Sequence, residues 1–279
     1  MKKALPIFWN IVFIIYQPQM IYQPKGKARE YSEYALNYYS WCNHWCKYCY
    51  VPKLLWRFNS KYKHWEVTAN FDKLKKIETS CKKYKWGQVL LSFTWDPYTP
   101  LEEEINFTTA VLEILCKYDV ETAILTKWWS RCLKDLDLFK KFKKIKIWMT
   151  LTTDNNEDSK KWECNASFPQ DRFETLEILH NEGITTRASL EPVLYPEQSL
   201  NIIDITNKYV DQYKVWKLNW YAQHEKKIDR RKFWETAIEK LRNYWNAFYV
   251  KNDLAKYITI EMTKQERDMD YLAVWTQTR

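Results

Sequence analysis

Three closely spaced cysteines, Cys42, Cys46 and Cys49, are the residues of this chain best suited to chemistry. Their spacing is C-x₃-C-x₂-C, and a fourth cysteine with ligand spacing is absent. A structural zinc site normally closes with four protein ligands, whereas cubane iron–sulfur clusters are held by cysteine thiolates. Three thiolates leave one iron with an open position, where a small molecule can bind and be reduced. The spacing therefore predicts a [4Fe-4S] cluster with one free coordination position.

A zinc knuckle that borrows His44 is the competing interpretation of the same residues. His44 lies between the first two cysteines, which leaves little room for it to share a tetrahedron with them. A zinc-binding module that binds nucleic acid through basic helices stays open as the alternative from another class of protein.

The bulk composition is that of a cytoplasmic protein with no membrane partner. The 279 residues are 46% hydrophobic, enough for the core of one large domain, and no apolar run reaches the length of a membrane span. Seven cysteines, three of them clustered, suit a reducing compartment better than a disulfide framework. The net charge of +9 allows DNA or RNA as a partner, although lysine-rich tracts are more often solvated helix faces.

Apolar runs alternate with helical patterns along most of the chain, which implies a parallel sheet with right-handed crossovers. Six such units are too few for an eight-fold barrel. The predicted α/β fold is therefore a (βα)₆ partial TIM barrel with outer helices. Strands are expected at 34–39, 88–94, 120–126, 145–153, 184–190 and 213–219.

Three regions are expected along the chain. Residues 1–29 form an N-terminal extension, 30–225 the partial-barrel domain, and 226–279 a C-terminal helical cap and tail, with a long helix over 229–250.

Polar residues recur where each predicted strand ends, while the strand interiors are apolar. In a parallel barrel, functional residues lie on the loops that follow the strands. The sequence therefore predicts that these residues share one edge of the sheet. Besides the cysteines they are Thr94, Asp96, Thr126, Lys127, Thr152, Thr153, Glu191, Lys217 and Asn219.

The cysteine motif resembles that of the radical S-adenosylmethionine (SAM) enzymes, C-x₃-C-x-aromatic-C, with Tyr48 as the aromatic residue. Three further stretches are similar to the spore photoproduct lyase-like, or DNA-repair photolyase-like, branch of that superfamily, and the resemblance covers about residues 20–225. They are Ala28-Arg29-Glu30-Tyr31 through Tyr48-Cys49-Tyr50-Val51-Pro52, then Ser92-Phe93-Thr94-Trp95-Asp96-Pro97-Tyr98, and Leu125-Thr126-Lys127.

The resemblance implies that SAM chelates the open iron and is cleaved after one electron arrives from a flavodoxin- or ferredoxin-type protein. The resulting radical abstracts hydrogen from the substrate. Asp96, with Thr94 beside it, is expected to accept hydrogen bonds from the methionyl ammonium, and Lys127 to pair with the methionyl carboxylate. Further residues expected to bind cofactor or substrate are Thr126, Thr152, Glu191 and Asn219; a capping or turn role stays open for each.

Tyr48 and Tyr50 match the tyrosines that relay a radical in spore photoproduct lyases. Those lyases also use a cysteine at the end of the second strand as hydrogen donor, and Phe93 stands at that position here. Phenylalanine cannot donate hydrogen, so Cys132 or Cys164 would have to replace it. The substrate therefore stays open between damaged DNA and an RNA, a peptide or a small metabolite.

The chain has only 3 glycines but 16 tryptophans. At the usual glycine share of about 7%, a chain of this length holds roughly 20 glycines. Tryptophans also stand where turns need a residue without a Cβ. We infer that many of these codons are UGA read as glycine in the source organism; a protein truly rich in tryptophan is the alternative. The suspected positions are Trp41, Trp45, Trp95, Trp128 and Trp129.

Overall fold

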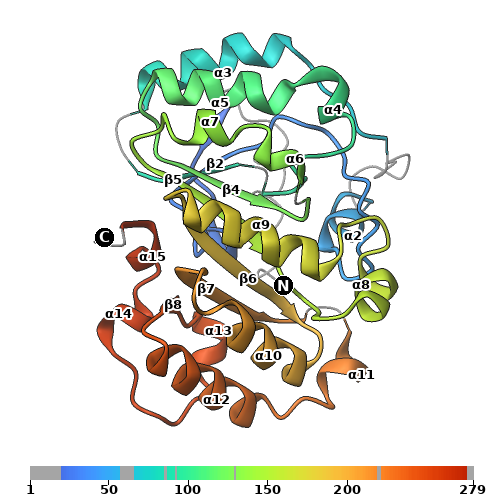
Figure 1. The fold of residues 1–279 in the computed structure, drawn as a ribbon, viewed down its shortest axis with the longest axis vertical. Coiled ribbons are helices and arrows are strands. Elements are labelled where there is room, and N and C mark those ends of the chain that lie inside the picture. Colours follow the sequence, from blue (N-terminus) through green and yellow to red (C-terminus); the bar gives the residue numbers. More distant parts are fainter. Residues whose placement is uncertain are drawn as a thin grey trace, which may run out of the picture.

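The computed structural model describes residues 20–56, 66–84, 87–91, 93–128, 130–218 and 221–274. Within them, eight strands form one sheet in the order of the chain (Figure 1). The first pair is antiparallel and every later pair is parallel. The fold is therefore α/β with a mostly parallel sheet, as expected. The strands are β1 (Ile21–Tyr22), β2 (Tyr34–Leu36), β3 (Val89–Leu91), β4 (Thr122–Thr126), β5 (Ile145–Thr150), β6 (Thr185–Val193), β7 (Gln212–Lys217) and β8 (Ala247–Tyr249).

Helices follow most of the strands. The range 102–117 holds two helices rather than one, because Asn106 takes a left-handed φ of 51° between them. The helices are η1 (Gly26–Ala28), α2 (Tyr50–Trp56), α3 (Asp72–Lys83), α4 (Glu102–Ile105), α5 (Phe107–Lys117), α6 (Ser130–Leu133), α7 (Leu136–Phe139), α8 (Asn156–Trp162), α9 (Pro169–Asn181), α10 (Pro196–Thr206), α11 (Ala222–Glu225), α12 (Arg230–Asn243), α13 (Asn252–Ala255), α14 (Lys264–Arg267) and α15 (Tyr271–Val274).

All six predicted strands are present, and the sheet has two more. β1 lies in the expected extension. The predicted helix over 229–250 is present as α12, but it ends at Asn243, and β8 occupies the last part of that range. The helix α12 ends at Asn243 because Trp245 takes a left-handed φ of 59°. The amides of Trp245 and Asn246 then donate to the carbonyls of Arg242 and Leu241, both at 3.1 Å, which closes the helix in a Schellman motif.

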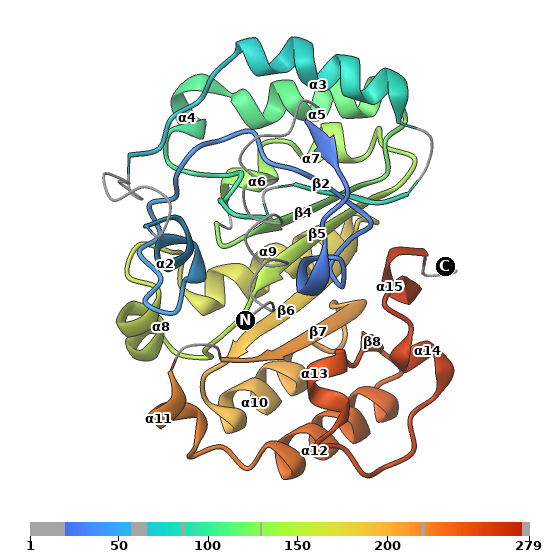
Figure 2. The same cartoon turned by 180° about the vertical axis from the view of Figure 1, so that it is seen from behind.

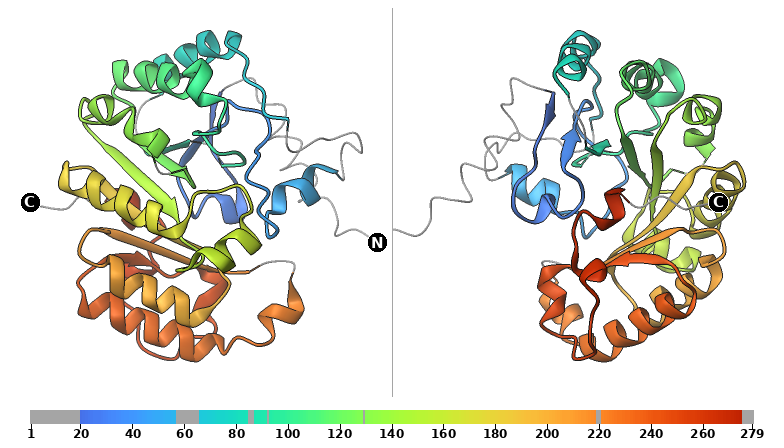
Figure 3. Two further views of the ribbon diagram at one scale, coloured as in Figure 1. Left: turned by 45° about the vertical axis from the view of Figure 1, so that its right-hand side comes forward. Right: turned by 90° about the vertical axis from the view of Figure 1, so that its left-hand side faces the viewer.

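The sheet is curved, with its long helices on the outer side (Figures 1 and 3). Side chains alternate between the two faces of a strand. In β6, Ala188 and Leu190 face the helices as part of the main core, so Arg187 and Ser189 face the opposite, inner side. The inner face is turned toward the viewer in Figure 2. No helix in the described ranges is long and apolar enough to cross a bilayer.

The C-terminal tail closes one end of the inner face. The carbonyl of Leu272 in α15 accepts hydrogen bonds from Lys146 Nζ at 2.6 Å and Arg187 Nη2 at 3.2 Å. Both cations are buried near the beginnings of β5 and β6. The tail therefore supplies a hydrogen-bond acceptor to two buried cations.

Ending the chain after Asp268 should destabilise the fold, because Lys146 and Arg187 lose this acceptor. We expect a loss of about 1–3 kcal/mol in the free energy of unfolding, the usual cost of a buried polar group that loses its partner. Urea unfolding followed by circular dichroism measures it. A chain ended after Val274 keeps Leu272 and is the matched control; equal stability of the two truncated chains would contradict the bracing role.

Candidate metal centre

The three motif cysteines lie on the loop between β2 and α2. Each thiol is partly buried, and burial raises its pKa, to about 12 for Cys42. Their charges also act on one another, since Cys46 feels both Cys42 and Cys49. In the described residues, no three His, Cys, Asp or Glu side chains converge on a position for one metal ion. The three thiolates of a cubane cluster need not converge on one point, because each binds a different iron. The donor set therefore fits such a cluster.

The backbone of the cysteine loop depends on two left-handed residues. Trp41 has a φ of 77° and Trp45 a φ of 55°. This region is open to glycine and costs other residues roughly 1–2 kcal/mol. Each of these residues directly precedes a motif cysteine, so the backbone strain of the loop lies next to the thiols.

Asp96, on the loop after β3, fastens the cysteine loop to the next strand. Its Oδ2 accepts from His44 Nε2 at 2.8 Å and from the amide of Lys127 at 2.7 Å. Its Oδ1 accepts from the Thr126 hydroxyl at 2.7 Å and from the amide of Tyr98 at 2.9 Å. Burial alone would raise the pKa of this carboxyl, but His44 and the other donors lower it. Asp96 is therefore an ionised hub shared by three loops.

This arrangement bears on the predicted role of Asp96 as a ligand of the methionyl ammonium. Both carboxylate oxygens already accept two hydrogen bonds each, so an ammonium would have to be an additional donor; the role stays a prediction. Sequence reasoning considered His44 only as a zinc ligand. Its side chain is 3% exposed and its bond to Asp96 makes it a positioning residue for the cysteine loop.

Replacing His44 by leucine should loosen the cysteine loop, because Asp96 loses the donor that the loop supplies. We expect about a 10–100-fold lower affinity for iron, the effect of losing a supporting residue behind a metal ligand. Iron content after reconstitution measures it. A His44→Gln variant keeps an N–H donor and should recover most of the iron; equal losses in both variants would contradict the bracing role.

Lys127 follows β4 and lies above the aromatic residue of the motif. Its Nζ is 5.7 Å from the ring centroid of Tyr48, and its charge lowers the pKa of Cys46 and Cys49 against the effect of burial. The ammonium therefore lies near the cysteines; its role as a partner of the methionyl carboxylate stays a prediction.

A buried carboxylate that the sequence did not indicate completes this side of the site. Glu163 accepts from the Tyr48 hydroxyl and forms an ion pair with Arg172 at 2.6 Å. Burial raises its pKa, but Arg172, Lys127 and Tyr48 lower it. Glu163 follows α8 and pairs with Cys46 in an isolated β-bridge. No motif marks Glu163 and Arg172, which lie 9 residues apart.

The other predicted residues are spread along the same side of the sheet. Tyr50 donates to the carbonyl of Phe93 at 3.4 Å. Both the amide and the hydroxyl of Thr94 donate to Asn37 at 3.2 Å. The hydroxyl of Thr152 is buried and has no hydrogen-bond partner in the described part of the chain, which leaves it open to a ligand. Asn219 and Trp129 lie outside the described residues.

Glu191, near the end of β6, faces inward among basic residues. Its carboxylate accepts from Ser189 at 2.8 Å and lies 3.1 Å from Lys251 Nζ. Burial raises its pKa, but Lys251 and Lys214 lower it. Glu191 is therefore part of a charged inner face rather than of the cysteine loop.

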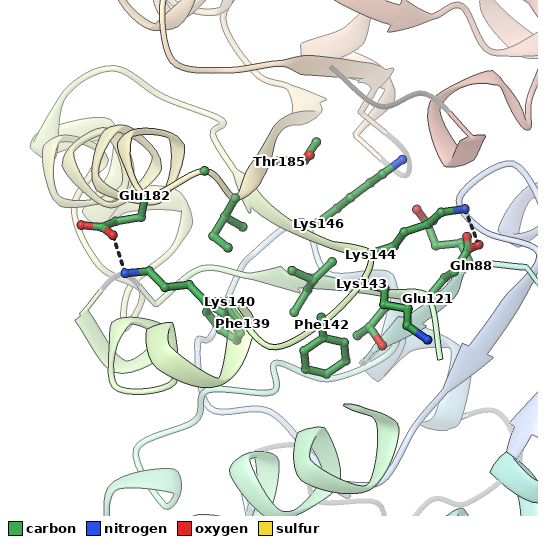
Figure 4. A pocket seen from close by; sticks show the side chains of 14 residues that line it. Gln88, Glu121, Phe139, Lys140, Phe142, Lys143, Lys144, Lys146, Glu182 and Thr185 are labelled. Carbon is green, nitrogen blue, oxygen red and sulfur yellow. Dashed lines mark hydrogen bonds and ion pairs between the residues drawn. The ribbon is translucent and has the colours of Figure 1, made fainter. Parts of the chain in front are cut away.

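A cavity of about 250 Å³ lies at the opposite end of the strands (Figure 4). Lysines around it are matched by acids: Lys140 pairs with Glu182 at 2.5 Å and Lys144 with Glu121 at 2.7 Å. Its lining includes the residues at the start of β4, β5 and β6. It is therefore separate from the cysteine site.

The fold resembles that of radical SAM enzymes. SuiB of Streptococcus suis bound to S-adenosylmethionine superposes with a TM-score of 0.59 and 13% identity, over 78% of this chain and 50% of SuiB. Spore photoproduct lyase complexed with dinucleoside spore photoproduct superposes with a TM-score of 0.60 and 13% identity, over 82% of this chain and 77% of the lyase. The chain thus spans about half the length of SuiB.

The chain belongs to the family of the uncharacterized protein MJ0683 of Methanocaldococcus jannaschii. The two are 30% identical over 197 residues, which are 70% of this chain and 73% of the archaeal protein. The uncharacterized protein ORF301 of Acidianus two-tailed virus is 26% identical over 186 residues, 62% of this chain and 60% of the viral protein. No protein-family model matches the chain.

Proposed function

We propose that this protein is a radical SAM enzyme, in which Cys42, Cys46 and Cys49 hold a [4Fe-4S] cluster. One observation carries the proposal: three mutually interacting cysteines lie beside Lys127 at the carboxyl edge of a parallel sheet with the radical SAM fold. A bound cluster supplies the electron that breaks a carbon–sulfur bond of SAM. The chain's own part is to bind, orient and shield.

Several groups of this chain suit SAM. The ammonium of Lys127 can donate a charge-assisted hydrogen bond to the methionyl carboxylate. The unpartnered hydroxyl of Thr152 can bind a ribose hydroxyl. Asp96 and His44 hold the cysteine loop in place. We keep Thr94, Thr126, Glu191 and Asn219 as further cofactor or substrate contacts.

For the substrate we propose a nucleic acid, with damaged DNA as the first candidate. The net charge of +9 and the fold shared with spore photoproduct lyase support this choice. Phe93 still lacks a hydrogen to donate. Cys132 is fully buried in the core, whereas Cys164 is exposed next to Glu163, so Cys164 is the better placed replacement. RNA, a peptide and a small metabolite are the alternatives.

Anaerobic reconstitution tests the proposal. We expect about four irons per chain, a brown protein, and conversion of SAM to 5′-deoxyadenosine and methionine on reduction. A colourless protein with one zinc per chain would overturn it. The same reduced protein, given SAM and ultraviolet-irradiated DNA, should remove lesions; loss of SAM without loss of lesions would reject DNA and keep the enzyme class. A flavodoxin- or ferredoxin-type protein of the cytoplasm is the proposed reductant.

We further propose that many of the tryptophans are glycine in the natural protein. Two kinds of observation support this. Of the five non-glycine residues with positive φ in the described chain, three are tryptophans: Trp41, Trp45 and Trp245. Buried indole N–H groups usually find a partner, yet those of Trp128, Trp148 and Trp216 have none among the described residues. Reading the gene decides it, since UGG at these positions would exclude recoding.

A further inference from the structure

The inner face of the sheet carries an unusual concentration of buried cations. Lys146 on β5, Arg187 on β6, Lys214 on β7 and Lys251 just after β8 are each at most 6% exposed. They alternate along their strands with residues that face the outer helices, such as Ile147 and Ala188. Four neighbouring elements thus each place a cation on the same side of the sheet.

The acids among them do not balance these charges. In the described chain, Glu191 and Glu30 act on Lys214 and Lys251, whereas Glu121, which is paired with Lys144, acts on Lys146. Glu191 lies 3.1 Å from Lys251, and the carboxylate of Glu30 accepts from Tyr249 at 2.9 Å. Lys214 donates to the backbone carbonyl of Glu30. Arg187, Lys214 and Lys251 therefore share two carboxylates, those of Glu191 and Glu30, on the inner side of the sheet.

Burial is unfavourable for these ammonium groups. It lowers the pKa of Lys214 well below its usual range and that of Lys251 to about 8. A buried charge without an opposite charge beside it is strongly destabilising. A bound anion would supply that charge.

A line of contacts joins these cations to the cysteine loop. The Nζ atoms of Lys214 and Lys251 each lie 3.9 Å from the ring centroid of Tyr31. Tyr31 packs edge-on against Phe93 at 5.1 Å, and the Phe93 carbonyl accepts from Tyr50 at 3.4 Å. Tyr50 directly follows Cys49. The cations thus lie deeper on the same side of the sheet as the cysteine site.

We propose that the inner face, through Lys214 and Lys251, binds an anionic group of the substrate, a phosphate or a carboxylate. The assignment rests on the proposed function, because it names what the substrate of that site must carry. The anion brings the local charge close to balance, and Tyr31 and Glu191 mark the path toward the exposed Tyr50. The Trp216 ring, centred 3.0 Å from Lys251 Nζ, covers that ammonium.

Calorimetric titration of the reconstituted protein with pyrophosphate, inorganic phosphate and citrate tests the assignment and separates phosphate from carboxylate. We expect saturable binding of at least one of them, weakened at least about tenfold in Lys251→Met and in Lys214→Met. Lys143→Met removes an exposed lysine paired with Asp119 and should bind like the unchanged chain. Trp216→Gly uncovers Lys251 and should bind more tightly.

Glu191→Gln removes a competing carboxylate and should also tighten binding, which keeps the test decisive where a lysine variant fails to fold. The absence of saturable binding, or equal affinities in the Lys143, Lys214 and Lys251 variants, would overturn the assignment. SAM cleavage by the unchanged chain without any added anion is measured on the same preparation. Its absence counts against the proposed function, whereas cleavage without anion binding counts against this site alone.

Discussion

Replacing Cys46 by alanine is expected to leave a protein that retains almost no iron and cleaves almost no SAM. Cys46 is central in the motif, and its thiol interacts with both other cysteines and with Lys127. Losing a residue that merely supports a metal ligand costs up to about 100-fold in affinity, so losing a ligand itself should cost more. Iron content and the yield of 5′-deoxyadenosine from SAM measure the two effects.

Cys116→Ala is the matched control for this experiment. Cys116 is a half-exposed thiol in α5, on the outer side of the sheet and outside the motif. Its removal should change neither iron content nor SAM cleavage. An alanine variant at Cys46 that still binds four irons, or a Cys116 variant that loses them, would contradict the assignment of the ligands.

The strands and the sharing of one sheet edge could be predicted because their signals are local. Apolar runs such as 145–150 are long enough to be recognised as strands, and a parallel sheet places the carboxyl ends of its strands at one edge. β1 was missed because its two residues are too few to show a period. β8 was missed because the helical pattern of α12 was extended through its residues. The break at Asn106 was missed because a left-handed residue inside a helical pattern leaves no trace in hydrophobicity.

The site was only partly predictable for a different reason. The motif identifies the three cysteines as candidate ligands, but the residues that support the cysteine loop can be identified only from the fold. Glu163 and Arg172 meet because the segment after α8 packs against the cysteine loop, where the amide of Lys47 donates to Trp162 at 2.8 Å. The sequence placed Glu191 at a strand end as a cofactor or substrate contact, but it did not show that Lys251 lies 3.1 Å from its carboxylate. Such contacts between side chains depend on how distant segments pack, which the position of a residue in the sequence does not show.

Replacing Trp245 by glycine is expected to stabilise the protein by about 1–2 kcal/mol, the cost of a left-handed conformation for a residue with a Cβ. The indole is 92% exposed, so little packing is lost with it. The Schellman hydrogen bonds of α12 need only the backbone. Urea unfolding measures the gain. Trp234→Gly, a buried position within the same helix, should instead destabilise, and a loss of stability in both variants would contradict the argument.

The same reasoning applies with larger consequence at Trp41 and Trp45, where the strained residues adjoin Cys42 and Cys46, two of the proposed cluster ligands. Strain stored in the loop opposes the arrangement in which its thiolates bind metal, and two left-handed residues together amount to roughly 2–4 kcal/mol if their effects add. Restoring glycine at both should therefore raise the iron retained after reconstitution as well as the stability. Iron titration of the double variant beside Trp245→Gly separates the two effects, because the latter relieves strain far from the cysteines. Equal iron affinity in these two variants would show that the loop strain does not act on the metal centre.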